Sequence, residues 1–228
     1  MIRSIIIHLA TFFLKKEVVI DSDVSNRYLM RLLLGSLFKV LRGYFLFLRL
    51  CFVGCGVTLV SKSRIKLGRS VRLADFVFMD AEGKKGIVLS DRVSIGPYTR
   101  IAVSGSLRAL GQGVFIGADS AIGDFSHIGG AGGVTIGNDT ICGSYLSIHP
   151  ENHNFTNLDI PIRLQGVNHQ GITIGNNCWI GAKVTILDGA KIGDGCIVAA
   201  GAVVRGHFPD NVILGGVPAK IIRQRGNE

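Results

Sequence analysis

A polar segment between Ile148 and Ile172 holds the side chains of this sequence best suited to proton transfer. It reads HPENHNFTNLDIPIRLQGVNHQG and contains His149, His153 and His169. An imidazole with its ordinary pKa of about 6.5 is mostly neutral at pH 7 and can accept a proton from a hydroxyl. Groups that act this way often lie on loops that a rigid scaffold positions. The segment is therefore a candidate catalytic loop, and the residues around it must supply the scaffold.

A six-residue repeat lies on both sides of this loop and indicates what the scaffold is. After the loop, large aliphatic residues recur at Ile174, Ile180, Ile186, Ile192, Val198 and Val204. Before it, the same spacing appears in blocks separated by short phase slips: Leu89, Ile95, Ile101 and Leu107; Ile116, Ile122 and Ile128; Ile136, Cys142 and Ile148. A period of six fits neither an α-helix nor a flat strand, but it fits short strands that each end in a turn. Three such edges per coil predict a triangular prism, an all-β solenoid with a dry aliphatic interior.

The composition separates the chain into two parts. The 228 residues are 47% hydrophobic and include 31 glycines, which excludes disorder for most of the chain, and the glycines lack the three-residue period of collagen. Residues 1–72 carry 13 Lys and Arg against 3 Asp and Glu, a balance of +10, and residues 73–228 carry 12 against 13, a balance of −1. Because the positive charge is confined to an apolar N-terminal third, it indicates an anionic membrane surface rather than nucleic acid as a partner.

Two apolar runs in this N-terminal third predict helices. The first, Ile2 to Leu14, is shorter than the roughly twenty apolar residues of a bilayer span, and Lys15, Lys16 and Glu17 follow it in place of a signal-peptide cleavage site. The second, Arg27 to Val53, has bases at 27, 31, 39, 42 and 49, which share one helical face. We expect an amphipathic helix lying in a lipid interface; the alternative is a helix packed on the protein with a solvated basic stripe.

The repeat also carries motifs of a known family. Cys178-Trp179-Ile180-Gly181-Ala182, Ile186-Leu187-Asp188-Gly189, Ala200-Gly201-Ala202-Val203-Val204 and Gly216-Val217-Pro218-Ala219-Lys220 stand in it. Over residues 60–225 the chain closely resembles the left-handed parallel β-helix acyltransferases of the hexapeptide-repeat superfamily, and the sugar and polysaccharide O-acetyltransferase branch fits best. The resemblance implies acetyl-CoA as the donor, no metal, and a homotrimer with active sites in the clefts between neighbouring prisms.

The resemblance assigns roles to particular residues. The catalytic histidine of such enzymes comes five residues after the last inward aliphatic before the loop, which places the general base at His153, beside Asn152 as a substrate-binding residue. Glu151 and Asp159 both remain open as the group that orients the imidazole. His149 is expected to be a corner or supporting residue, and His169 a solvated loop residue.

Further residues are implied to bind the two substrates. Trp179 is expected to face the acceptor or the pantetheine, or else a trimer interface, and Asp124, with Ser126 as an alternative, is a candidate acceptor ligand. The implied CoA contacts are Gly181, Ala182, Ala200, Arg205, Lys220 and Arg223. Since Cys142, Cys178 and Cys196 fall at inward positions, we expect direct attack in a ternary complex and no acyl-cysteine intermediate.

These expectations combine into one hypothesis with two rivals. Residues 1–56 form an N-terminal amphipathic helical membrane-associating region, and residues 57–228 form a left-handed β-helix acetyltransferase domain with an active-site loop at 149–171. The expected activity is transfer of acetyl from acetyl-CoA to a sugar hydroxyl of a bacterial surface polysaccharide or its precursor, at the cytoplasmic face of the membrane. The alternatives are a xenobiotic or amino-sugar N-acetyltransferase, and a zinc-dependent protein like the γ carbonic anhydrases, with His127, His149 and His153 as ligands.

Overall fold

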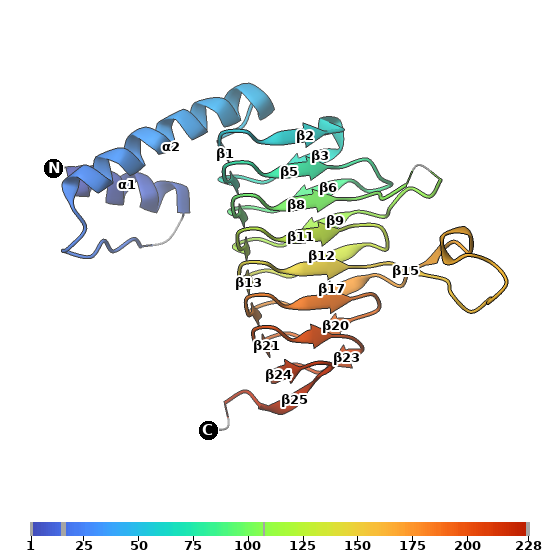
Figure 1. Ribbon diagram of the computed structural model, residues 1–228. Coiled ribbons are helices and arrows are strands. Elements are labelled where there is room, and N and C mark those ends of the chain that lie inside the picture. The colour runs from blue at the N-terminus through green and yellow to red at the C-terminus, as the bar shows by residue number, and fades with distance from the viewer. Residues whose placement is uncertain (1, 15–16, 107, 227–228) are drawn as a thin grey trace.

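The protein is a three-sided parallel β-helix with two α-helices packed at one end (Figure 1). The computed structural model describes residues 2–14, 17–106 and 108–226. Each coil contributes one short strand to each of three sheets, A, B and C in that order along the chain, and neighbouring coils pair in parallel register. The three-sided solenoid predicted from the hexapeptide period is therefore confirmed, as is the left-handed parallel β-helix that the family resemblance implies.

The strands are two to six residues long and follow one another in each sheet in a fixed spatial order. Sheet A contains β1 (Phe52–Val53), β4 (Arg72–Leu73), β7 (Ser94–Ile95), β10 (Ala121–Ile122), β13 (Ile141–Cys142), β18 (Trp179–Ile180), β21 (Ile197–Val198), β24 (Val212–Gly216) and β25 (Ala219–Gln224). Sheet B contains β2 (Thr58–Val60), β5 (Phe78–Asp80), β8 (Arg100–Ala102), β11 (His127–Gly129), β14 (Ser147–His149), β19 (Thr185–Leu187) and β22 (Val203–Val204). Sheet C contains β23 (His207–Phe208), β20 (Lys191–Ile192), β17 (Ile172–Ile174), β12 (Val134–Ile136), β9 (Val114–Ile116), β6 (Ile87–Leu89) and β3 (Ile65–Leu67).

The repeat positions point inward and form one continuous core. Ile101, Ile128, Ile148 and Ile186 stack on one another across sheet B, and each is 0% exposed. Each such side chain contributes roughly 1.5 to 3 kcal/mol by leaving water. The small residues two positions before an aliphatic are buried as well: Cys178, Val184, Ala190, Cys196 and Ala202. Leu107, which the repeat also places inward, lies outside the described residues.

The corner between sheets A and B carries a column of exposed aromatic rings. Phe76, Tyr98, Phe125 and Tyr145 occupy the same turn position in successive coils, each with positive φ. Their rings stack with centroid distances of 5.0, 5.0 and 5.3 Å, and their side chains are about half exposed. This aromatic ladder gives the A–B corner an apolar edge that faces solvent in a single chain.

The corner between sheets B and C is the one at which the chain leaves the prism. The longest excursion follows β14 and returns at β17, and it projects to the right in Figure 1. A shorter excursion occupies residues 103–113 between β8 and β9. The chemistry-bearing loop is therefore one of a set of B–C connections, while the A–B corners stay tight.

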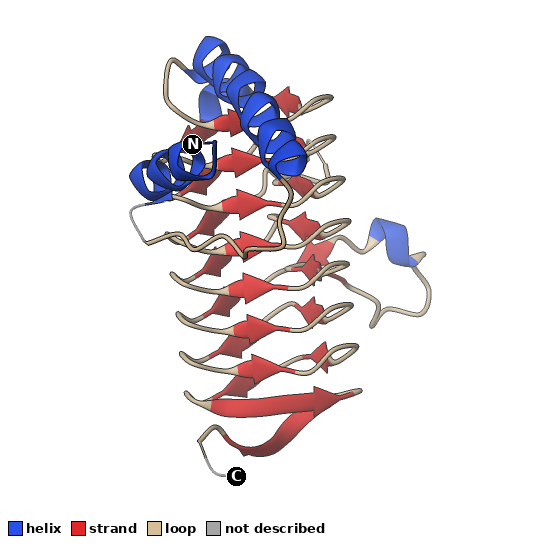
Figure 2. Ribbon diagram, turned by 90° about the vertical axis from the view of Figure 1, so that its left-hand side faces the viewer, coloured by secondary structure: helices blue, strands red, loops and turns tan. Residues whose placement is uncertain are grey.

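The N-terminal region forms both predicted helices, α1 (Ile2–Leu14) and α2 (Asn26–Phe47), but α2 ends six residues before the predicted limit at Val53, which lies in β1. The Ser25 hydroxyl caps α2 by accepting a hydrogen bond from Tyr28 N at 3.2 Å, and Leu48 ends it in the left-handed region. Both helices lie over the upper strands of sheet A (Figure 2). Sheet A itself begins at β1, so the solenoid starts a few residues before the expected boundary at residue 57.

The basic face of α2 differs from its expected role. Arg42 donates a hydrogen bond to Val53 O at 2.7 Å, Arg49 donates to Leu67 O at 3.0 Å, and Lys39 lies 3.8 Å from the Asp75 carboxylate. Three of the five bases therefore contact the solenoid instead of facing lipid headgroups. The physical reason is that the first coil of the β-helix leaves carbonyl groups at its open end, and cationic side chains satisfy them.

Within the described residues, no helix combines the length and the hydropathy needed to cross a membrane.

Candidate active site

The candidate loop is a short β-hairpin that extends from the B–C corner. After β14, the chain forms β15 (Asn152–His153), which pairs antiparallel with β16 (Val167–Asn168) before entering β17. A single 3-10 turn, Ile162–Leu164, lies near the tip, and the Gln165 amide donates to the carbonyls of Asn157 and Ile160 at 2.7 Å each. The loop thus has its own hydrogen-bonded structure and is held to the prism at its base.

Asp188 holds both ends of this loop. Its carboxylate accepts hydrogen bonds from the backbone N–H groups of Gln170 and Gly171 at 2.9 Å each, in the returning segment between β16 and β17. It also accepts one from the Asn152 side chain at 3.2 Å, on the outgoing strand. Hydrogen bonds to an ionised carboxylate are stronger than neutral ones. Asp188 therefore fixes the position of the hairpin relative to sheet B, a role that the sequence motif Leu187-Asp188-Gly189 did not reveal.

His153, the predicted base, lies on the outgoing strand of the hairpin opposite Val167 and is exposed. Among the described residues its imidazole makes no hydrogen bond, and neither Glu151 nor Asp159 forms a hydrogen bond or ion pair with it. The side chain of the neighbouring Asn152 donates a hydrogen bond to Asp188. The single chain therefore presents His153 outward, without an orienting carboxylate.

Two further imidazoles, those of His127 and His149, lie close together on the outer face of sheet B, in neighbouring coils. His149 Nε2 lies 2.7 Å from Ser147 Oγ, and its ring centroid lies 5.6 Å from that of His127. Burial lowers the pKa of His127, with smaller contributions in the same direction from His149 and Arg100. A histidine kept neutral in this way can accept a proton.

Sequence reasoning placed His149 in a supporting role and His127 only among zinc ligands. Their proximity follows from the strand register, in which His127 pairs with Ser147. Within the described part of the chain, no three His, Cys, Asp or Glu side chains come together as a potential metal site.

The residues implied to bind CoA lie on several edges of the prism. Ala182 and Ala200 are exposed at the A–B corner, in successive coils. Gly181 is buried between them, and its N–H donates to Val198 O at 2.8 Å, so its amide is committed to the sheet. The Gly181 amide is therefore not free to contact CoA, because the strand pairing of β18 with β21 uses it.

The basic members of the set lie on two different edges of the prism. Lys220 and Arg223 are exposed on β25, the antiparallel partner of β24 at the C-terminal end of sheet A. Arg205 is exposed after β22, at the B–C corner.

The candidate acceptor residues do not gather at the hairpin. Trp179 lies on the outer face of sheet A and is 55% exposed, beside Ile141 in register. Asp124 packs against Gly96 of the preceding coil at the A–B corner, and the Ser126 hydroxyl is buried and donates to Gly123 O at 2.8 Å. In one chain, sheet B separates these groups and the Ala182–Ala200 corner from the loop that carries His153.

Replacing Asp188 by Asn tests the loop anchor. Loss of the charge weakens three hydrogen bonds at the loop base, so we expect faster proteolysis within residues 150–170 and a large loss of enzymatic rate, while the denaturant midpoint of the solenoid changes little. Asp194→Asn, which removes a carboxylate that binds Asn176 at a different corner, is the matched control. Unchanged proteolysis of Asp188→Asn would show that the hairpin is held by other contacts.

Comparison with known proteins finds relatives of the repeat region. A model of the bacterial transferase hexapeptide (six repeats) matches residues 171–206. The chain is 38% identical over 130 residues to a protein of Escherichia coli K12 named "Putative lipopolysaccharide biosynthesis O-acetyl transferase WbbJ", covering 54% of this chain and 66% of WbbJ. It is 37% identical over 134 residues to "Probable acetyltransferase Rv3034c" of Mycobacterium tuberculosis, covering 58% and 42%. The matched region thus spans less than two thirds of these relatives' lengths.

Solved structures agree on the fold. A hexapeptide-repeat acetyltransferase of Vibrio cholerae in complex with acetyl-CoA, VCA0836, aligns with a TM-score of 0.51 and 25% identity over 60% of this chain and 69% of its own. The N-acyltransferase AntD of Bacillus cereus aligns with a TM-score of 0.53 and 18% identity over 82% and 89%, which shows similarity of fold. The hexapeptide period, the three-sided prism and these similarities together show a hexapeptide-repeat β-helix that is similar to acetyltransferases of this fold.

Proposed function

We propose that this protein is an acetyl-CoA-dependent O-acetyltransferase that acetylates a sugar hydroxyl of a bacterial surface polysaccharide or its precursor. The observation that carries the proposal is the histidine-bearing hairpin, which the half-buried carboxylate of Asp188 anchors to a rigid hexapeptide prism. Similarity to a relative named as a lipopolysaccharide O-acetyl transferase supports the sugar hydroxyl as acceptor.

The chemistry needs one proton transfer and no covalent enzyme intermediate. A neutral imidazole takes the proton of the acceptor hydroxyl as its oxygen attacks the thioester carbonyl, the C–S bond breaks, and CoA leaves as the thiol after protonation. The nearby cysteines are unsuited to acyl transfer, since burial raises the pKa of Cys142 to about 12 and also raises the pKa values of Cys178 and Cys196. Direct attack in a ternary complex is therefore favoured, with His153 as the base.

The proposed donor site on this chain combines small exposed residues with cations. Ala182 and Ala200 present small exposed side chains against which a pantetheine arm can lie. Lys220, Arg223 and Arg205 are exposed cations for the phosphate groups of CoA.

A homotrimer brings the two halves of the site together. In one prism the hairpin and the Ala182–Ala200 corner lie at opposite ends of the sheet B strands, so a neighbouring copy has to supply one of them. Exposed apolar groups suited to such contacts are present in the aromatic ladder and in Ile141 and Trp179, which are 52% and 55% exposed.

Replacing His153 by Ala tests the base. We expect kcat for acetyl transfer to fall by about 10² to 10⁴ with little change in the KM for acetyl-CoA, because the general base is lost and the donor site is kept. The assay follows thiol release with a panel of defined glycans and locates the acetyl group by mass spectrometry. His207→Ala, at an exposed position on β23, is the control.

Two outcomes would revise this assignment. If His149→Ala abolishes turnover and His153→Ala does not, the base is the imidazole bonded to Ser147. Turnover of small amines with no turnover of any glycan would contradict the O-acetyltransferase proposal.

Mixing two inactive variants tests the shared site. His153→Ala lacks the base, and Ala200→Trp blocks the donor surface at an exposed corner. In randomly assembled trimers, about a quarter of the sites combine an intact hairpin with an intact donor corner from the neighbouring copy. Co-refolding should therefore restore about a quarter of the wild-type rate, whereas a site contained within one chain would give none.

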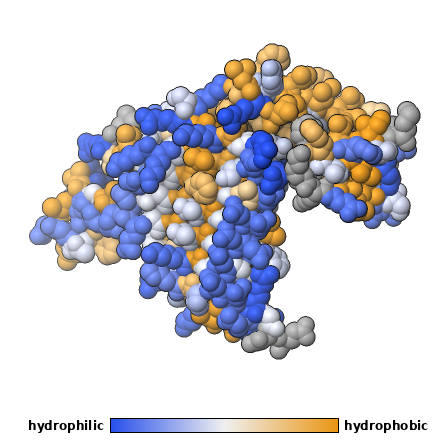
Figure 3. Space-filling view, turned by 180° about the vertical axis from the view of Figure 1, so that it is seen from behind, coloured by the Kyte–Doolittle hydropathy of each residue, from blue (hydrophilic) through white to orange (hydrophobic). Residues whose placement is uncertain are grey.

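The N-terminal helices supply a membrane-binding surface in this proposal. With Lys39, Arg42 and Arg49 engaged by the solenoid, the outer face of α2 is mainly apolar, and Phe38 and Phe45 are 63% and 79% exposed. Figure 3 shows this hydrophobic surface at its upper right. Arg27 and Arg31 are also exposed and can approach anionic headgroups. We propose that this face holds the enzyme peripherally at the cytoplasmic side of the membrane, where acetyl-CoA is available.

Vesicle flotation separates the apolar and ionic contributions. Burial of two aromatic side chains contributes roughly 3 to 6 kcal/mol, and two cations near an anionic surface contribute about 2 kcal/mol. Phe38→Ser/Phe45→Ser should therefore lose more binding to phosphatidylcholine–phosphatidylserine vesicles than Arg27→Gln/Arg31→Gln. The wild-type protein should still float with pure phosphatidylcholine. A protein that stays at the bottom of the gradient with both lipids would contradict the membrane role.

A further inference from the structure

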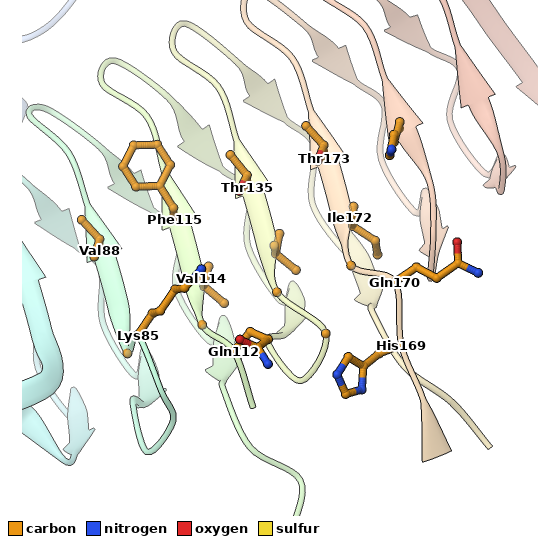
Figure 4. Close-up of a pocket in the computed structure, with 17 residues that line it drawn as sticks. Lys85, Val88, Gln112, Val114, Phe115, Thr135, His169, Gln170, Ile172 and Thr173 are labelled. Atoms are coloured by element: carbon orange, nitrogen blue, oxygen red, sulfur yellow. The ribbon is translucent and has the colours of Figure 1, made fainter. Parts of the chain in front are cut away.

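A trough of about 570 Å³ runs along the outer face of sheet C, beside the B–C corner (Figure 4). Its floor is a column of outward side chains in strict register on five neighbouring strands: Val88, Phe115, Thr135, Thr173 and Lys191. Strands in a sheet lie about 4.8 Å apart, so the floor extends for about 19 Å along the prism axis. The trough is therefore long and narrow, and its side chains repeat at a fixed spacing.

The walls of the trough come from the excursions at the B–C corner. His169 and Gln170 extend from the returning strand of the catalytic loop, and Gln112 and Lys85 extend from two earlier coils (Figure 4). Much of the remaining lining is backbone, because glycines with positive φ occupy the corner in successive coils: Gly86, Gly113, Gly133 and Gly171. A ligand can thus approach peptide groups closely along this wall.

The trough combines positive charge with neutral polar groups. Its described lining includes Lys85 and Lys191 and contains no carboxylate. Asp188 is not part of the lining, and its carboxylate accepts hydrogen bonds from the N–H groups of Gln170 and Gly171. Two threonine hydroxyls and two glutamine amides are neutral hydrogen-bonding groups, the His169 imidazole adds a further polar group, and Phe115, at 41% exposed, offers an aromatic surface.

We propose that this trough binds an anionic glycan chain, running along the prism axis, as an acceptor subsite of the acetyltransferase. Hydroxyl and amide groups match the hydroxyl-rich edges of sugars, Phe115 matches an apolar sugar face, and the lysines match carboxylate or phosphate substituents. The volume lies within the range of about 300 to 1,000 Å³ that is usual for ligand sites. The length of the floor suits several linked sugar units instead of one.

A single-stranded nucleic acid fits this surface less well. Proteins that bind it stack successive bases on several aromatic side chains along a strongly basic groove. The described lining of the trough has one aromatic ring and two lysines.

The trough is continuous with the catalytic loop. His169 and Gln170 directly follow β16, which pairs with the strand that carries His153. A glycan lying in the trough therefore passes the base of the hairpin. Asp188 fixes the position of this base and of Gln170 in the trough wall. The inference rests on the proposed function for its biological meaning, but binding itself is measurable without acetyl-CoA.

Isothermal titration calorimetry of the full chain at low ionic strength tests the proposal. The probes are a glucuronate-containing oligosaccharide, its carboxyl-reduced neutral counterpart, a phosphate-substituted oligosaccharide and a single-stranded oligonucleotide. We expect the wild-type protein to bind the anionic sugars and to bind the neutral sugar at least about tenfold more weakly. The relative affinities for the two anionic sugars identify which anion the lysines recognise.

Variants place the binding in the trough. Lys85→Gln/Lys191→Gln should weaken anionic sugar binding by about tenfold or more. The matched control Lys84→Gln/Lys183→Gln removes the same charge from exposed positions outside the lining and should have much less effect. Phe115→Ala should weaken charged and neutral sugars to a similar extent, and His153→Ala should bind normally.

Several results would overturn the inference. The first three are no binding of either anionic sugar, equal losses of sugar affinity in the two lysine double variants, and tighter binding of the oligonucleotide than of the sugars. The fourth is concentration-dependent association of the protein that Phe115→Ala abolishes, which would make sheet C an interface between copies. Failure of acetyl transfer with normal sugar binding would instead contradict only the proposed function.

Discussion

The inward stacking of one aliphatic side chain per strand is the constraint on which the rest of this structure depends. Each buried residue lies on its counterpart in the neighbouring coil, as Ile128 does on Ile148, and the three sheets share one dry interior. Because the coils must stay in register to keep these contacts, outward residues also form columns at fixed spacing. The aromatic ladder, the His127–Ser147 pair and the floor of the sheet C trough are all consequences of this register.

The prism positions chemistry by leaving one corner free to vary. At the A–B corner the turns are tight, and small residues such as Ala182 and Ala200 expose the backbone. At the B–C corner the chain can be extended without disturbing the core, and the hairpin with His153 is such an extension. A flexible hairpin would place a base poorly, because catalysis needs reacting groups held in a narrow range of geometry. Asp188 restricts the hairpin by joining both ends of the loop to a rigid coil with charge-assisted hydrogen bonds.

The helical cap and the hairpin loop share one electrostatic principle. In each case a charged side chain satisfies backbone groups that a change in the regular structure leaves without partners. Arg42 and Arg49 donate to carbonyls at the open end of the solenoid, and Asp188 accepts hydrogen bonds from N–H groups where the loop rejoins it. The use of cations at the cap leaves an exposed apolar face on α2, so the membrane attachment proposed above would rest mainly on hydrophobic contact.

The sequence by itself determined the solenoid, its inward residues and the place where the repeat is interrupted, since a hexapeptide period is a local property that every coil repeats. It also located both N-terminal helices, from their apolar runs. Only the tertiary structure decided that Lys39, Arg42 and Arg49 face the solenoid, that Gly181 commits its amide to the sheet, and that His127 meets His149. It likewise decided that Asp188 reaches Asn152, 36 residues away, and that His169 lines a trough. These contacts depend on which coil stacks on which. Phase slips and loop lengths between coils determine that stacking, and the six-residue pattern within a coil does not reveal it.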